Sequence, residues 1–171
     1  DDAEDYGVHS GDITGCPNNI GPGKYIGNLT TGSNCTITVT TPVWLTGDAT
    51  IGNAVVLRMN PNLGSSSGVL IIDGITNFSN GDDILGTGVA GSYLTLLSTY
   101  DSRSSGTIAI NTGNSSLTGI LYAPFGTINL ANSANFKEAV AWKIIMGNST
   151  ILTYDSGLVS TFFSTGPGGS Y

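Results

Sequence analysis

The stretch GTIAI at residues 106–110 recurs 20 positions later as GTINL at residues 126–130. An Asn-containing polar turn follows each copy, at residues 111–116 and 131–135, and a second apolar run follows each turn. A period near 20 residues, with short β-branched runs between Asn and Gly corners, is typical of stacked coils. The repeat therefore predicts an all-β fold, a right-handed parallel β-helix or solenoid with coils of about 20 residues.

Short strand-forming runs, separated by clusters of Gly, Asn and Ser, occur along most of the chain. In a solenoid, inward Ile, Val and Leu would stack from coil to coil, while Asn and Gly would occupy left-handed corners. Helical character is confined to residues 135–142, NFKEAVAW. An antiparallel β-sandwich is the alternative fold. The expected strands lie at residues 25–26, 35–40, 43–45, 54–57, 69–72, 93–97, 107–110, 120–122, 127–130, 140–142, 143–146 and 151–154.

The composition separates this chain from several broad classes of protein. Charged residues make up 10% of it, against about 25% in an ordinary soluble domain, and Gly, Asn, Ser and Thr together make up nearly half. The hydrophobic share of 39% is enough for a core, which excludes a disordered chain. Net charge is −7 and no basic stripe occurs, so we expect no nucleic-acid partner. No run of about 20 apolar residues occurs, so we expect no membrane segment in this chain.

Acidic residues are concentrated at the start of the chain. Five of the twelve acids lie in the first twelve residues, and the basic residues are scattered. We therefore expect an acidic N-terminal arm or linker at residues 1–15 and a single solenoid domain at residues 16–171. The five are Asp1, Asp2, Glu4, Asp5 and Asp12.

The two cysteines, Cys16 and Cys35, stand 19 positions apart. A four-ligand zinc site would need histidines, and His9 is the only one in the chain. The Cys-x-x-Cys spacing of redox pairs is absent. A structural disulfide is therefore expected, worth about 3 kcal/mol in the chain-entropy model, and it implies an oxidising, extracytoplasmic setting.

No nucleophile, acid–base or cofactor motif is visible, so we expect neither catalysis nor a cofactor. The adjacent acids Asp82 and Asp83 are weak candidates for a calcium site, because calcium prefers oxygen ligands. Among the aromatic residues, Trp44 and Tyr100 are candidates for stacking on a sugar ring. A polysaccharide-acting enzyme would need a carboxylate cluster drawn from a small set of acids. That set is Asp48, Asp73, Asp82, Asp83 and Asp101.

Five sequons make N-glycosylation a further candidate modification, although many sequons arise by chance in a chain rich in Thr and Asn. The asparagines are Asn28, Asn34, Asn77, Asn114 and Asn148.

Several blocks of sequence, in the same order along the chain, resemble the C-terminal region of bacterial PilX-type proteins, minor-pilin-like components of type IV pilus systems. The clearest block is ILYAPFGTINL at residues 120–130. The resemblance implies a solenoid and no transferable catalytic residue; the hydrophobic pilin helix of that family is missing, and the cysteine pair is not expected throughout it. The other blocks are VWLTGDATI at 43–51, SGVLIIDG at 67–74, GSYLTLLST at 91–99, YDSGL at 154–158 and GPGGS at 166–170.

These observations predict a non-enzymatic structural or adhesive domain of a pilus-like or filamentous appendage, located outside the cell or on its surface. Its partners would be other filament subunits or further copies of itself, and surface glycans are a second candidate partner. A strand exchanged from the acidic arm is one route to self-assembly. A carbohydrate-binding adhesin module and a polysaccharide-acting β-helix enzyme remain as alternatives.

Overall fold

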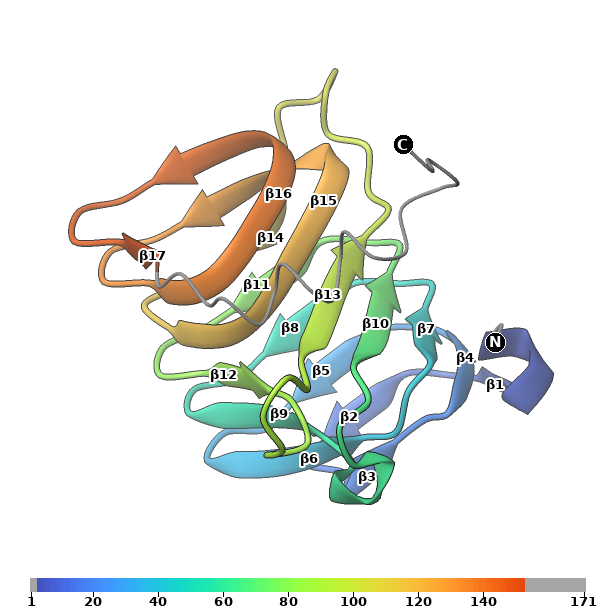
Figure 1. The fold of residues 1–171 in the computed structure, drawn as a ribbon. Helices are drawn as coiled ribbons and strands as arrows, with labels where there is room; N and C mark the ends of the chain where they lie inside the picture. Colours follow the sequence, from blue (N-terminus) through green and yellow to red (C-terminus); the bar gives the residue numbers. More distant parts are fainter. Residues whose placement is uncertain (1–2, 153–171) are drawn as a thin grey trace, which may run out of the picture.

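The computed structural model describes residues 3–152, and nearly all of its regular structure is β-strand (Figure 1). The blocks at 154–158 and 166–170 therefore lie outside the described residues, as do Asp1 and Asp2. In chain order the elements are η1 (Ala3–Tyr6), β1 (Val8–Ser10), β2 (Ile13–Gly15), β3 (Asn19–Ile20), β4 (Gly23–Ile26), β5 (Leu29–Thr31), β6 (Cys35–Val39), β7 (Val43–Leu45), β8 (Ala49–Ile51), β9 (Val55–Met59), η2 (Pro61–Leu63), β10 (Gly68–Ile72), β11 (Thr76–Phe78), β12 (Asp83–Leu85), β13 (Leu94–Ser98), β14 (Ile108–Asn111), β15 (Ser116–Leu130), β16 (Asn135–Met146) and β17 (Ile151–Leu152).

The strands form three parallel stacks, because every pairing among β1 to β14 joins strands whose numbers differ by three. The first stack contains β1, β4, β7, β10 and β13; the second contains β2, β5, β8, β11 and β14; the third contains β3, β6, β9 and β12. The long strands β15 and β16 turn the corners between stacks (Figure 1). Every pairing between described strands is parallel, which confirms the parallel solenoid and excludes the antiparallel sandwich.

The coil length varies along the stack. Lys24 pairs with Trp44, which is 20 positions later, whereas Trp44 pairs with Ile71, which is 27 positions later. The extra residues form surface turns such as the one that contains η2, so they leave the stacked strands in register. The two copies of the sequence repeat lie on adjacent coils, but Ile110 pairs with Ile128, only 18 positions later. The observed register therefore differs by two residues from the 20-residue offset of the repeat. Because strand side chains alternate between faces, a shift of two residues keeps the same side chains facing inward.

The core consists of aliphatic side chains that stack on their equivalents in neighbouring coils. In the third stack, Ile37 pairs with Leu57 and Leu57 pairs with Ile84, and all three are at most 1% exposed. Burying each such side chain contributes about 1.5–3 kcal/mol, which makes these columns the main source of stability.

Glycine forms the corner between the first and second stacks. The amide of Gly47 donates to the carbonyl of Gly27 at 2.9 Å, and the amide of Gly74 donates to Gly47 at 3.1 Å. A Cβ placed on Gly47 would stand 2.4 Å from the Gly27 carbonyl oxygen. Beside the glycines, Oδ1 of Asn28 accepts from the amide of Asp48 at 2.9 Å. Side-chain acceptors at this corner thus form a ladder from coil to coil in which Asp alternates with Asn.

A second corner, between the second and third stacks, uses the left-handed backbone conformation. Asn34, Ala54 and Gly81 occupy equivalent places with φ of 57°, 55° and 73°. The Asn34 amide donates to the carbonyl of Asn53, and the Ala54 amide donates to that of Asn80. Asn and Gly tolerate this conformation well, which explains their enrichment between the strand-forming runs.

Cys16 and Cys35 form the predicted disulfide, with their Cα atoms 6.2 Å apart. The bond links the first coil to the second, since Cys16 follows β2 and Cys35 begins β6. Chain entropy gives such a link about 3 kcal/mol of stabilisation.

Two features differ from the expectations. Residues 8–15, expected to belong to an acidic arm, form β1 and β2 of the first coil, which pair with β4 and β5. Residues 135–142, which have helical character by sequence, instead belong to strand β16. In both cases pairing with a neighbouring coil overrides local composition, because a strand gains hydrogen bonds and a buried face from that coil.

Candidate functional site

The last coil is the most unusual surface of the described structure. Strand β16 pairs with β15 along its length, but with β17 only through Asn135 and Phe136. Within residues 3–152, the outer edge of 138–146 has no strand partner. Such an edge presents backbone donors and acceptors on which another strand can pair.

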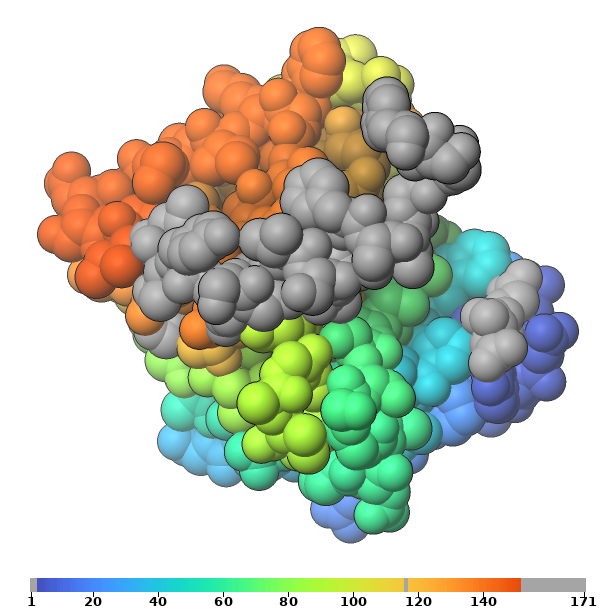
Figure 2. All heavy atoms as spheres, viewed as in Figure 1, coloured from blue at the N-terminus to red at the C-terminus, as the bar shows by residue number. Residues whose placement is uncertain are grey.

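Most of the large apolar side chains that are exposed in the described residues lie on this coil. Figure 2 shows the coil, in orange, at the end of the stack opposite the blue N-terminal coil. Trp142 is 63% exposed and Met146 is 59% exposed. The exposed apolar residues of the coil are Val140, Trp142, Ile144, Ile145, Met146 and Ile151.

The register explains why these side chains are apolar. Ile144 pairs with Ile128, and Met146 pairs with Leu130. Ile128 and Leu130 are fully buried, whereas Ile144 is 40% exposed. Ile144 and Met146 thus stand in positions that form the core one coil earlier. A further layer of strands would bury them.

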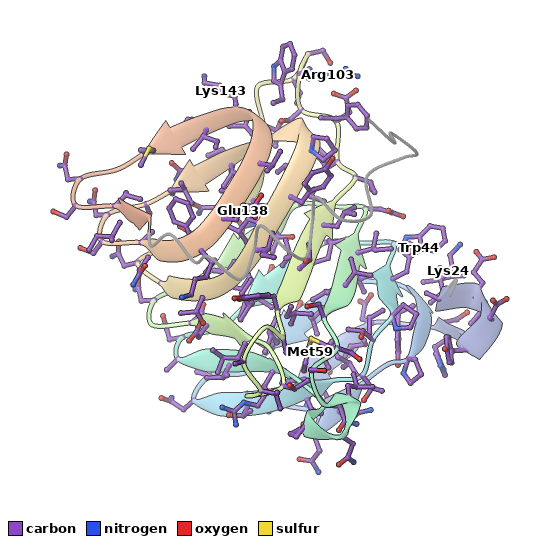
Figure 3. The ribbon with its side chains drawn as sticks, in the orientation of Figure 1. Lys24, Trp44, Met59, Arg103, Glu138 and Lys143 are labelled. Carbon is purple, nitrogen blue, oxygen red and sulfur yellow. A yellow bond between two sulfur atoms is a disulfide. The ribbon has the colours of Figure 1, made fainter. Side chains whose placement is uncertain are left out.

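The opposite end of the stack is acidic. Glu4 and Asp5 lie in η1, and Asp12 lies between β1 and β2. Strand β16 of the last coil contains Lys137, Glu138 and Lys143. Figure 3 labels Lys143 and Glu138 on this coil. The two ends therefore differ in charge as well as in hydrophobicity.

Trp44 and Tyr100, the candidates for sugar stacking, lie in different surroundings. The Lys24 ammonium group lies 3.6 Å from the ring centroid of Trp44 and covers one face of that ring (Figure 3). The indole N–H donates to Asp73 at 2.8 Å. Tyr100 follows β13 two coils away, next to Thr99, whose hydroxyl also donates to Asp73 at 2.7 Å. The Trp44 ring is thus partly occupied by contacts within the chain.

The five aspartates considered for catalysis are dispersed. Asp48 accepts from the Ile75 amide at one corner, and Asp73 joins Trp44 to Thr99. Asp101 forms an exposed ion pair with Arg103, whose hydrogen bonds lower the pKa of Asp101 to about 2. In residues 3–152, no three His, Cys, Asp or Glu side chains are grouped so as to hold a metal ion.

Asp82 and Asp83, the weak calcium candidates, act as hydrogen-bond acceptors within the fold. The two carboxylate oxygens of Asp82 accept from the amides of Val55 and Ser79. Oδ1 of Asp83 accepts from the Ile84 amide and from both the amide and hydroxyl of Thr118. Burial raises the pKa of both carboxyl groups, and these hydrogen bonds only partly offset it.

The sequon asparagines differ in how far the fold uses their side chains. The amide group of Asn28 donates to Asp12 and accepts from Asp48, so a glycan there would replace a corner hydrogen bond. Asn34 and Asn114 are exposed at corners, and Asn148 is exposed near β17. Asn77 is half-buried on β11. Glycosylation at the exposed corners would leave the coils intact.

Sequence reasoning did not single out the last coil. Ile144, Ile145 and Met146 read as an ordinary core strand, and only their register against β15 identifies them as an exposed end. A 16-residue spacing between Ile128 and Ile144 is the signal that would have linked them to the preceding coil.

In comparisons with known proteins, no family model, no curated protein and no solved structure matches this chain. Among the described residues, no helix has both the length and the hydropathy needed to cross a membrane. The described residues, 3–152, therefore define a parallel β-solenoid whose coil at residues 135–152 carries exposed apolar side chains.

Proposed function

We propose that this chain is a non-enzymatic structural and adhesive domain of a filamentous appendage outside the cell, assembled by stacking solenoids end to end. The observation that carries the proposal is the last coil, where Ile144 and Met146 occupy core positions at a strand edge. Their burial by another copy would remove apolar surface from water and pair the edge of β16.

The two ends favour a head-to-tail arrangement. The first coil presents β1 and β2 with Asp5 and Asp12 nearby, and the last coil has Lys143 and apolar side chains. A head-to-tail contact along the axis of the stack leaves a free end of each kind, so it generates an open filament. Charge complementarity also sets the polarity of the contact.

Three further observations support this role. The disulfide is compatible with an oxidising compartment, which agrees with an extracellular location. Asp48, Asp73 and Asp101 are each engaged in a different contact within the fold. The ordered sequence blocks that resemble PilX-type proteins suggest a pilus-like appendage in particular.

Sedimentation velocity over a series of protein concentrations tests the proposal. We expect the mean mass of the wild-type chain to rise continuously with concentration. The double variant Ile144→Ser/Met146→Ser should raise the concentration for assembly at least tenfold, because full burial of one such side chain contributes about 1.5–3 kcal/mol.

Val89→Ser is the matched control, since Val89 is 48% exposed in the turn before β13 and belongs neither to the first coil nor to β16. It should assemble as the wild type does. Circular dichroism would establish that all variants are folded. A wild-type chain that stays monomeric, or that stops at a closed dimer, would contradict the proposal.

A further inference from the structure

A groove of about 630 Å³ runs along the third stack. Its floor contains Arg58 of β9, Leu85 of β12, Thr118 of β15 and Lys137 of β16. One wall is the turn 86–93, which joins β12 to β13 and projects from the stack (Figure 1). The groove thus crosses several successive coils.

The register places the floor residues in one column. Arg58 pairs directly with Leu85. Thr118 donates to Asp83 in the same strand as Leu85. Thr118 and Lys137 directly follow Leu117 and Phe136, which pair with each other. With coils about 4.8 Å apart, Arg58 and Lys137 stand roughly 14 Å apart along the groove.

The wall is held in shape by hydrogen bonds to the preceding coil. The Thr87 amide donates to the Ser92 hydroxyl at 3.0 Å, and that hydroxyl donates to the Ser66 carbonyl at 2.7 Å. The Tyr93 amide donates to Ser67 at 3.1 Å. Thr87 and Ser92 are both buried. A preformed wall lowers the ordering cost of binding a ligand.

The groove brings two basic residues together, and Arg58 also acts electrostatically on Asp83. Lys24 and Arg103 form ion pairs with Glu4 and Asp101. Two of the other three basic residues, Arg58 and Lys137, line the groove. A planar guanidinium group at one end suits bidentate binding of a carboxylate. The floor between the two cations is apolar at Leu85 and carries a hydroxyl at Thr118.

We propose that this groove binds an acidic oligosaccharide, with Arg58 and Lys137 holding two of its carboxylates. The ring faces would lie on Leu85, and the sugar hydroxyls would meet Thr118 and the glycine-rich wall. Nucleic acid is a poorer fit, since it requires many basic contacts and this chain has net charge −7. The inference rests on the adhesive half of the proposed function and supplies its ligand class.

Isothermal titration calorimetry of the full chain with oligogalacturonate tests the inference, with the methyl-esterified oligomer as a neutral ligand of the same sugar. The acidic oligomer should bind at least tenfold more tightly than the ester, and more weakly as salt rises. Arg58→Gln and Lys137→Gln should each lower the affinity about tenfold. Lys143→Gln is the matched control, since Lys143 pairs with Thr127 on the second stack.

Backbone NMR shifts of the wild-type chain supply a readout that needs no variant, and they should change in the turn 86–93. Equal affinity for acid and ester, or an equal loss in the Lys143→Gln chain, would overturn the inference. Shift changes confined to other regions would do the same. Repeating the titration with Ile144→Ser/Met146→Ser separates the two proposals, because binding should persist where assembly is lost.

Discussion

The fold buries the carboxyl group of Asp83, which makes the negative charge of that group unfavourable. Its Oδ1 atom accepts all three hydrogen bonds, from the Ile84 amide and from the amide and hydroxyl of Thr118. Burial raises the pKa of this carboxyl group, so its negative charge is a cost that these bonds, and nearby Arg58, only partly offset. Asn offers the same Oδ1 acceptor without the charge.

Asp83→Asn should therefore stabilise the chain at neutral pH. In the wild type, a raised pKa means that the folded chain binds the proton more tightly than the unfolded chain. The contribution of Asp83 to stability is then largest at low pH and declines as the pH rises above the ordinary value of 3.8. The pKa of Asp82 is also raised, so the Asp83→Asn variant should still lose some stability as the pH rises.

Urea unfolding of the wild type and the variant between pH 4 and pH 7 measures this difference, with the pH range chosen about the ordinary value. The free energies of unfolding should converge at the acidic end and separate towards neutral pH. Asp5→Asn, in the exposed η1, controls for the loss of one charge. A variant that is less stable than the wild type at pH 7 would contradict the account of Asp83.

At the scale of elements, the corners determine how closely the coils can stack. Gly27, Gly47 and Gly74 lie one above another and donate from amide to carbonyl. At Gly47 it is crowding by the Gly27 backbone, rather than a left-handed conformation, that demands glycine. Substitution there must push two coils apart.

Gly47→Ala should cost about 3 kcal/mol or more, the upper range for overpacking a tight site. Gly106→Ala is the matched control, because its φ is 70° and nothing lies within 4 Å of the added Cβ. It should cost about 1 kcal/mol, the penalty for a left-handed non-glycine residue. Chemical denaturation measures both, and equal losses would contradict the stacking account.

The strands differ in how well the sequence predicts them. The five-residue strands Gly68–Ile72 and Val55–Met59 contain several apolar residues and were expected close to their true positions. Shorter strands of the same stacks were missed: Val8–Ser10, Asn19–Ile20 and Asp83–Leu85. The second-stack strands Leu29–Thr31, Ala49–Ile51 and Thr76–Phe78 were missed. They have three residues each, with a polar residue facing outward, so their strand character comes from pairing with adjacent coils.

The candidate sites were predicted less well than the fold. Cys16 and Cys35 were paired correctly, because two cysteines allow only one intrachain bond. The groove joins Arg58 to Lys137, residues far apart in sequence whose proximity depends on coil lengths that vary from turn to turn. A regular period of about 20 residues would have placed them four coils apart, whereas the observed register places them three coils apart.

At the scale of the whole molecule, the stack has two unlike ends. The first coil is joined to the second by the disulfide and carries an acidic turn at Glu4 and Asp5. The last coil presents the strand edge of β16 with Ile144 and Met146 exposed. This polarity is what a subunit needs in order to add in one direction only.

Electron cryomicroscopy of the chain at assembling concentrations tests the central claim most directly. We predict filaments in which the last coil of one copy abuts the first coil of the next, with the coil spacing of about 4.8 Å continuing across the junction. Filaments joined through the sides of the solenoid, or two-fold dimers closed at the last coil, would contradict it.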